Sequence, residues 1–289
     1  MKIVEGLEQG TPKWYDYRHR HVMATCSGVI AGEMRRFGRT PLKLWQEKVS
    51  GESQVIENEN MRLGKELEPL AREHFTKLTA IDVVPTVIES AEHSWAAASL
   101  DGLSHDQKYV VEIKVHKPEI YAKTLQGYVP EYYKPQFQKQ LYVSELDFLY
   151  YFPYDGSHGH VVKIYRDDDY IKKMIAAEKI FWDAVCNLEP PEECEEDFEV
   201  IQNPFLINLS ESYVQIKDRI KELEMEEEEL KEEILKRISG KNVICGPLKM
   251  QKVYRKGAVE YKAIPELSGV NLDQYRKKPT EYMLIRDIS

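Results

Sequence analysis

The sequence predicts an α/β fold of the α+β kind, built on a mixed central sheet. Two helical segments come first, and five short runs rich in β-branched and aromatic residues follow them. One helix separates the third run from the fourth, and another follows the fifth. The 289 residues leave room for one large domain and an appendage.

The first two elements are predicted to be helices. Residues 27–48 carry interspersed bases, and residues 57–78 form a longer segment with apolar residues three or four apart. Because such positions share one side of a helix, the second helix is expected to bury that side. The residues expected to face inward are Leu67, Leu70, Ala71, Phe75 and Leu78.

The five strand-like runs are bounded by Gly, Asp or Pro, which favour turns. The runs cover residues 82–90, 94–103, 109–116, 148–156 and 160–167. Asp101 and Gly102 are expected to form a tight turn that ends the second strand. The segment "YDGSHG" is predicted to join the last two strands as a hairpin.

Two further helices complete this part of the chain. The first begins after Pro130 and precedes the fourth strand, and the second covers residues 168–188. The second helix is amphipathic, so one side is expected to pack on the sheet. Its inward residues are predicted to be Tyr170, Ile171, Met174, Ile175 and Phe181.

An acidic segment that contains proline marks the predicted domain boundary. The run "EPPEECEEDFE" holds two prolines and seven acids in eleven residues, which is a composition typical of linkers. We therefore assign residues 1–188 to a first domain, residues 189–204 to an acidic linker and residues 205–289 to a C-terminal appendage.

The appendage is predicted to contain one long helix and a β-hairpin. Apolar residues follow a heptad-like spacing from Tyr213 to Ile234, broken by Glu227. A charged helix that packs antiparallel within the same chain is favoured over an intermolecular coiled coil, because a sustained coil needs three or four clean heptads. A hairpin about Lys256–Gly257 and a final strand over residues 275–287 are expected to follow.

Charge is distributed unevenly along the chain. The formal net charge is −9, but residues 189–238 hold 17 acids and 6 bases, which leaves +2 for the remainder (−9 minus −11). Residues 1–50 carry 9 bases against 5 acids, and residues 240–289 carry 10 against 5. Two basic regions therefore flank an acidic spacer, and the net charge does not exclude a nucleic-acid partner.

Cysteine spacing and hydropathy indicate a reducing, cytoplasmic setting. The four cysteines include no Cys-x-x-Cys pair and form no dense framework, so reduced thiols are expected. The chain has no run of 18 apolar residues and no apolar signal segment near residue 1. We therefore expect a cytoplasmic protein without a membrane partner.

One short stretch carries residues suited to phosphodiester chemistry. In "VVEIKV", the strand period of two sends Glu112 and Lys114 to one face, and a hairpin can bring Asp101 beside Glu112. Two adjacent carboxylates repel each other, and a hard divalent cation such as Mg²⁺ relieves that repulsion. Lys114 can then hold or deprotonate a nucleophile and neutralise charge on a phosphate. For this short pattern alone, an exposed surface ion pair is the alternative interpretation.

The order of motifs resembles that of the PD-(D/E)XK nuclease superfamily. More closely, it is similar to the lambda-type phage exonucleases, also called the YqaJ-type viral recombinase family. The resemblance spans residues 14–185 and rests on "WYDYRHRHVMATCSGVIAG", "GKELEPLAREHF", "SLDGL", "VEIKV", "YKPQFQKQLYV" and "FLYYFPYD". It implies a restriction-endonuclease-like core with a C-terminal helical and β-hairpin appendage.

The resemblance also implies a metal site. Glu68 in "GKELE" would be a helix carboxylate that joins Asp101 and Glu112 in binding Mg²⁺, for which Mn²⁺ can substitute. The backbone carbonyl of Ile113 would be a further ligand, and Lys114 would be the catalytic lysine.

Further residues are implied around that site. Gln138 would support it from the helix after Pro130. Arg20 and Ser27 match the family residues for the DNA 5′-phosphate. Arg18 is a competing candidate, because Arg20 lies six residues after Trp14 where the family typically has four.

Together, the residues and the resemblance imply a Mg²⁺-dependent 5′-to-3′ exonuclease that resects double-stranded DNA ends for single-strand-annealing recombination. The implied partners are a single-strand annealing protein and further copies of the chain, as in a trimeric ring. One alternative is a structure-specific or nicking endonuclease of the same superfamily. The other is a DNA-binding or partner-docking protein whose nuclease site is vestigial.

Overall fold

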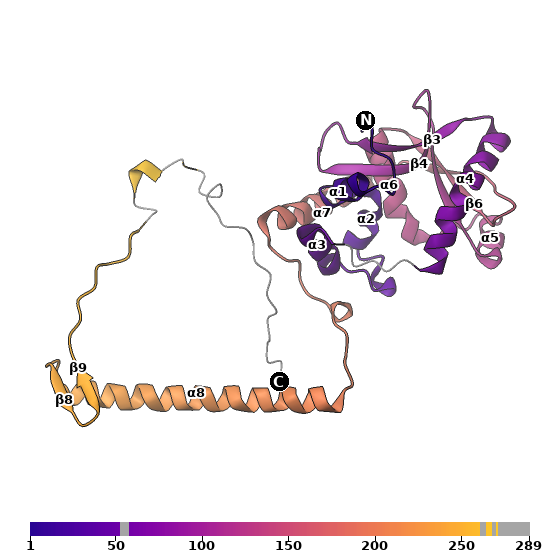
Figure 1. Cartoon of the computed structure of the whole chain (residues 1–289). Coiled ribbons are helices and arrows are strands. Elements are labelled where there is room, and N and C mark those ends of the chain that lie inside the picture. Colours follow the sequence, from indigo (N-terminus) through magenta and orange to yellow (C-terminus); the bar gives the residue numbers. More distant parts are fainter. Residues whose placement is uncertain (53–57, 261–263, 268–269, 271–289) are drawn as a thin grey trace. The chain divides into compact units, whose positions relative to one another are not determined.

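A computed structural model describes most of the chain and is shown in Figure 1. The described residues are 1–52, 58–260, 264–267 and 270. The chain divides into two units, Met1–Glu199 and Val200–Ser289. That division falls inside the predicted acidic linker, and each unit is considered by itself.

A seven-stranded mixed sheet forms the centre of the first unit, as the sequence predicts. Its strands are β1 (Lys2–Ile3), β2 (Val22–Met23), β3 (Val83–Glu89), β4 (Ala96–Ser104), β5 (Val110–Val115), β6 (Phe148–Tyr154) and β7 (Val162–Tyr165). The order is β1-β3-β4-β5-β6-β7, with β2 paired to β4. The β2–β4 and β5–β6 pairs are parallel and the other pairs are antiparallel. The β5–β6 connection is long because a parallel pair needs a crossover.

Helices cover this sheet. They are α1 (Pro12–His19), α2 (Ala24–Ile30), α3 (Pro41–Ser50), α4 (Glu59–Thr79), α5 (Pro118–Thr124), α6 (Lys134–Ser144) and α7 (Asp168–Asn187). On one face, Ala71 and Phe75 of α4 pack with Val111 and Ile113 of β5. The alternation predicted for β5 is therefore present, and its two apolar residues are buried.

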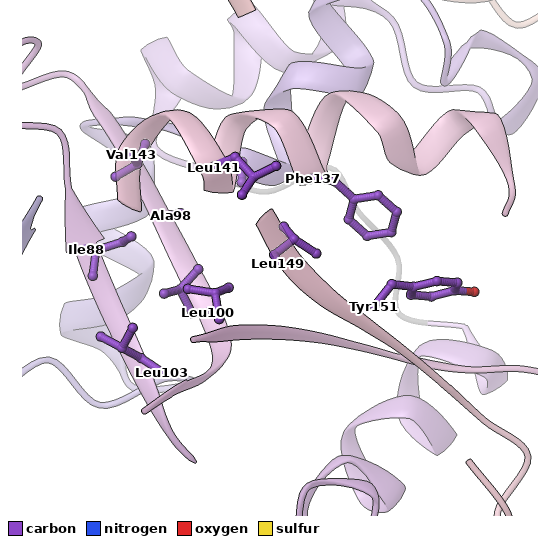
Figure 2. Packing of buried hydrophobic residues seen from close by; sticks show 11 residues of the cluster. Ile88, Ala98, Leu100, Leu103, Phe137, Leu141, Val143, Leu149 and Tyr151 are labelled. Carbon is purple, nitrogen blue, oxygen red and sulfur yellow. The ribbon is translucent and has the colours of Figure 1, made fainter. Parts of the chain in front are cut away.

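The opposite face of the sheet packs against α6. Figure 2 shows Phe137 and Leu141 of α6 above Leu149 and Tyr151 of β6, with residues of β3 and β4 beside them. All four of these side chains are buried. The buried seam fixes how α6 lies over the sheet, and α6 supplies side chains to the site described below.

Two details of the helix predictions are wrong. The segment expected as one helix over residues 27–48 is two helices, because the chain turns at Gly32 and Gly38, which have φ values of 79° and 70°. In α4, Leu70 and Leu78 were expected inward but are 51% and 60% exposed. The apolar side of α4 that packs on the sheet is narrow and includes Ala71 and Phe75. Leu70 and Leu78 lie outside that narrow side.

The expected turn at Asp101–Gly102 is also wrong, because β4 continues to Ser104. Leu103 pairs with Val84 and Leu100 pairs with Thr86, so Asp101 and Gly102 together oppose Pro85. This is a β-bulge, and proline suits it because proline has no N–H to give to a ladder. A Cβ at position 102 would lie 2.7 Å from side-chain atoms of Val111 and Val83, so glycine is required there by packing.

The second unit contains the predicted long helix, α8 (Pro204–Ile238), and a hairpin formed by β8 (Val243–Cys245) and β9 (Leu248–Met250). The hairpin turns at Gly246, so the expectation of a hairpin about Lys256–Gly257 is wrong. The final strand predicted over residues 275–287 lies outside the described residues. Over the described parts of both units, no helix is long and apolar enough to cross a membrane.

The packing at the bulge leads to a stability prediction. Gly102→Ala should lower the free energy of unfolding by about 1–3 kcal/mol, because the added methyl group overlaps two buried valines. Gly64→Ala, in α4 with open space around it, is the control and should raise stability by up to ~1 kcal/mol. Thermal or denaturant unfolding of both variants measures this difference. Equal stability of the two variants would contradict the packing role of Gly102.

Candidate metal-dependent active site

Asp101 lies in the β-bulge, where its peptide group leaves the regular ladder. Its backbone carbonyl accepts a hydrogen bond from Nε of Arg72 at 2.7 Å. Its Oδ2 accepts one from the backbone N–H of Ile113 at 2.8 Å. Counted from the turn that joins the two strands, the β4–β5 ladder ends at the Gly102–Val111 pair, so Asp101 and Glu112 lie just beyond it. The carboxylate of Asp101 is therefore held beside β5 between Glu112 and Lys114.

Glu112 of β5 is the buried carboxylate of the site, with a side chain only 1% exposed. Its Oε1 accepts hydrogen bonds from Lys114 Nζ and Gln136 Nε2, and its Oε2 accepts one from Gln140 Nε2. Gln136 and Gln140 are four residues apart on α6, so both reach the same carboxylate from one side of the helix. Charge-assisted donors of this kind offset the cost of burying an anion.

Glu68 reaches the site from α4. Its Oε1 accepts a hydrogen bond from Nη2 of Arg72, whose Nε binds the Asp101 carbonyl. One guanidinium therefore ties the α4 carboxylate to the β4 bulge. The side chain of Glu68 is 28% exposed, which leaves it accessible from solvent.

The three carboxylates repel one another. Burial, followed by the charge of Glu112, raises the pKa of Asp101 well above its ordinary value. Burial also raises the pKa of Glu68, with Glu112 acting in the same direction against Arg72. Raised pKa values of neighbouring acids are typical of sites that take up a cation.

Lys114 is the ammonium group that faces these acids. Burial opposes its charge, but the carboxylates of Glu112 and Asp101 outweigh that effect, and its pKa is raised. Its Nζ lies 5.2 Å from the ring centroid of Tyr133, so the ring limits where the ammonium can move. Lys114 is cationic across the physiological pH range and is 23% exposed.

The donor set suits a hard divalent cation. Asp101, Glu112 and Glu68 offer carboxylate oxygens, and the Ile113 carbonyl follows Glu112 on the same strand. Throughout the described ranges, no group of three His, Cys, Asp or Glu side chains already surrounds one point. Mg²⁺ is commonly held by one or two carboxylates together with waters and substrate phosphate, so two converging acids meet its need. Glu68 would join them by releasing Arg72.

Gln138, predicted to support the site, points elsewhere. Its amide donates to the Tyr165 carbonyl at 2.9 Å and accepts from the Asp167 N–H at 2.8 Å, so it joins α6 to the end of β7. The glutamines that do reach the site are its neighbours, Gln136 and Gln140. In "QFQKQ", alternate residues of a helix lie about 200° apart, so Gln138 faces away from the other two.

Two further residues of the site were not predicted from the sequence. They are Arg72, which contacts Glu68 and Asp101, and Tyr133, which lies beside Lys114. The signal for Arg72 is its position four residues after Glu68 on one helix side, a spacing typical of an ion pair. Nothing in the sequence signals Tyr133, because its position depends on the turn that precedes α6.

The predicted phosphate-binding residues separate in the structure. Ser27 is buried and its hydroxyl donates to Glu178 at 2.6 Å, where Glu178 also binds the buried Lys139. Ser27 is thus committed to a buried ion pair, which removes it as an accessible phosphate ligand. Arg20 is exposed at the end of α1.

Arg18 has the more organised surroundings. Its guanidinium lies 4.4 Å from the ring centroid of Trp14 and donates to the hydroxyl of Thr25 at 3.0 Å. The indole of Trp14 donates to Ser99 Oγ at 2.9 Å, two residues before Asp101. A guanidinium and a hydroxyl are therefore held together on a platform anchored to β4.

The fold and the arrangement of the acidic and lysine side chains define the structural class of this protein. A bulged Asp, a Glu-x-Lys strand beside it and a Glu from the covering helix, on a mixed sheet, make up the PD-(D/E)XK nuclease fold. Residues 13–147 match the family model of the YqaJ-like viral recombinase domain.

Three solved structures that are similar to this chain are exonucleases or a complex of one. The alkaline exonuclease from Laribacter hongkongensis has 23% identity and a TM-score of 0.54, over 62% of this chain and 94% of that chain. Its complex with dAMP gives the same values. A phage-related exonuclease from Haemophilus somnus 129PT has 15% identity and a TM-score of 0.43, over 61% of this chain and 99% of that chain. No curated protein matches the chain.

The repulsion at the site predicts a stability change that depends on pH. Because the folded-state pKa of Asp101 is raised, the associated stability is present below the ordinary value of 3.8 and is lost as the pH rises through the folded value. Asp101→Asn keeps an acceptor for the Ile113 N–H and removes the charge. The metal-free variant should therefore melt about 2 °C above wild type near pH 8, and the difference should shrink near pH 5.

Magnesium should reverse this order. Mg²⁺ is expected to raise the melting temperature of wild type by binding the folded state, and to leave Asp101→Asn almost unchanged. Differential scanning calorimetry with and without Mg²⁺ at both pH values measures both effects. A variant that melts below wild type without metal would rule out net repulsion at Asp101.

Proposed function

We propose that the protein is a metal-dependent DNA exonuclease that degrades one strand of linear duplex DNA from its 5′ end. The main support for this proposal is the hydrogen bond from the Ile113 N–H to Asp101, which places one carboxylate beside the Glu112–Lys114 pair. The likeness in fold to the alkaline exonuclease from Laribacter hongkongensis supports the same activity.

Each side chain of the site has a distinct part in the proposed cleavage. Asp101, Glu112 and the Ile113 carbonyl would hold Mg²⁺ or Mn²⁺, which supplies Lewis-acid polarisation of the phosphodiester. Gln136 and Gln140 each donate a hydrogen bond to Glu112 and keep its carboxylate oriented. The Lys114 ammonium would orient the attacking water and neutralise charge that develops on the phosphate.

Glu68 and Arg72 complete this arrangement. The Arg72 guanidinium holds the carbonyl of Asp101 and keeps Glu68 near the other acids, where Glu68 would be a further ligand for the cation. The amide oxygen of Gln140 is buried and accepts no hydrogen bond within the described ranges, which leaves one acceptor free beside Glu112. A water molecule is a suitable partner for it.

The 5′ direction rests on the basic platform near the site. We assign the 5′-phosphate to Arg18 and Thr25, with Arg20 as the competing arginine and Ser27 set aside because it is buried. A terminal phosphate carries up to one more negative charge than an internal diester, so a guanidinium with a hydroxyl discriminates between the two. The Trp14–Ser99 bond ties this platform to the strand of Asp101.

The product of such cleavage sets the wider role. Resection from the 5′ end leaves a 3′ single strand, which a single-strand annealing protein can use in recombination. In this proposal the partners are double-stranded DNA ends, an annealing protein and further copies of the chain, within the cytoplasm. The proposed domains are a nuclease at residues 1–188, a linker at 189–204 and an appendage at 205–289.

Loss of Lys114 should abolish the chemistry without loss of the fold. Lys114→Ala is expected to lower the rate of cleavage by about 100-fold or more, because one electrostatic contact to the transition state is removed. Folding should persist because β5 is held by Val111 and Ile113. Lys108→Ala, at an exposed lysine of the same hairpin, is the control and should cleave at the wild-type rate.

The assay for this pair uses linear duplex labelled separately at its 5′ and 3′ ends, with Mg²⁺ and with a chelator. Early release of the 5′ label by wild type and the Lys108 variant is expected only with Mg²⁺. Wild-type turnover by Lys114→Ala would remove the proposed active site. Early release of the 3′ label, or cleavage of closed circles, would instead favour an endonuclease or the opposite polarity.

Substitution of Arg18 and of Arg20 should affect the preference for a 5′-phosphate end differently. Wild type should degrade duplex with a 5′-phosphate faster than duplex with a 5′-hydroxyl. Arg18→Ala should lose most of that preference, since the guanidinium paired with Thr25 is removed. Arg20→Ala, a matched change two residues away, should keep it. The test is to measure the degradation rates of wild type and both variants on duplex with a 5′-phosphate and on duplex with a 5′-hydroxyl. Loss of the preference in Arg20→Ala alone would assign the phosphate contact to Arg20.

A further inference from the structure

The long helix α8 has an apolar side that nothing in its own unit covers. None of its 35 residues is buried. Heptad positions a and d run through ten residues, of which eight are apolar: Leu206, Leu209, Tyr213, Ile216, Ile220, Leu223, Glu227, Leu230, Ile234 and Arg237. The sequence favoured packing within the same chain. The described part of the second unit supplies no partner for this helix side.

We propose that α8 pairs with α8 of a second copy of the chain in an antiparallel coiled coil. The apolar stripe formed by these a and d positions extends over almost five heptads, with Glu227 and Arg237 as its two charged members. An isologous pairing centred between residues 221 and 222 brings every a position opposite a d position. Its layers are Leu206 with Arg237, Leu209 with Ile234, Tyr213 with Leu230, Ile216 with Glu227, and Ile220 with Leu223.

Charges beside the stripe select this occupant. In the antiparallel register, Lys217 lies at the flank opposite Glu224 of the second copy, and Arg219 lies opposite its Glu226. Across the described residues, none of these four side chains forms an ion pair within its own helix, whereas Lys231 and Arg237 each do. The charges that are unpaired within α8 therefore include two sets that complement each other across the two-fold axis.

The interruption of the stripe selects the orientation. A parallel, in-register pair would place Glu227 against Glu227 and Arg237 against Arg237 in the apolar seam, and like charges in a seam destabilise it. The antiparallel pair places Glu227 beside Ile216 and Arg237 beside Leu206. Each long side chain can then extend its charged end towards solvent.

The proposed α8–α8 pairing can be tested in the full-length chain with one substitution inside the apolar stripe and a control substitution outside it. Leu223→Glu puts a charge in the central layer, and Met225→Glu puts the same charge on the opposite side of α8, where Met225 is 60% exposed against 52% for Leu223. Sedimentation equilibrium should give an even number of 33.8 kDa chains for wild type and for Met225→Glu, and half that mass for Leu223→Glu. A monomeric wild type, or a Leu223→Glu variant of unchanged mass, would overturn the proposal.

Disulfide cross-linking tests the orientation. The background replaces Cys186, Cys194 and Cys245 by Ser and keeps the buried Cys26. Leu209→Cys and Ile234→Cys together should cross-link two chains, since these positions lie about 37 Å apart along one helix and cannot bridge within it. Cross-linked dimers from Leu209→Cys alone would establish a parallel pair and overturn the antiparallel arrangement.

Discussion

The candidate site depends on how the peptide group of Asp101 is satisfied outside the β-ladders. Pro85 of β3 has no N–H to offer, and the β4–β5 ladder stops at Gly102 and Val111. The Asp101 carbonyl therefore turns to Arg72, and its carboxylate takes the N–H of Ile113. The acids meet on the β5 side of β4, just beyond the end of the β4–β5 ladder, and the same arginine holds the carboxylate of α4 near them.

Burying Glu112 is the main electrostatic cost of this arrangement. The Glu112 carboxylate is 1% exposed, and hydrogen bonds from Lys114, Gln136 and Gln140 to both of its oxygens offset the cost of that burial. Those glutamines are in place because α6 is fixed on the sheet by the apolar seam of Figure 2. Core packing on one side of the sheet thereby sets the position of a charged group on the same side.

The sequence anticipated the strands, most of the helices and the acid–lysine cluster, because strand alternation and helix periodicity are local properties. It failed where distant residues decide the outcome. The Asp101–Gly102 pair resembles a turn until Pro85 of the neighbouring strand is taken into account. Gln138 was preferred over its neighbours because the rotation of α6 about its axis is set by tertiary packing. Ser27 likewise depends on a buried partner in α7, more than 150 positions along the chain.

The bulge and the hairpin end lie at different places along β4 and β5. Asp101 and Glu112 flank the open end of the ladder, whereas the turn that joins the strands lies beyond Ser104 and includes Gln107 in a left-handed conformation. Residues could be gained or lost in that turn, in numbers that keep the ladder in register, without displacement of either acid. The number of residues between the two acids is therefore free to drift during evolution, while the geometry between them is not.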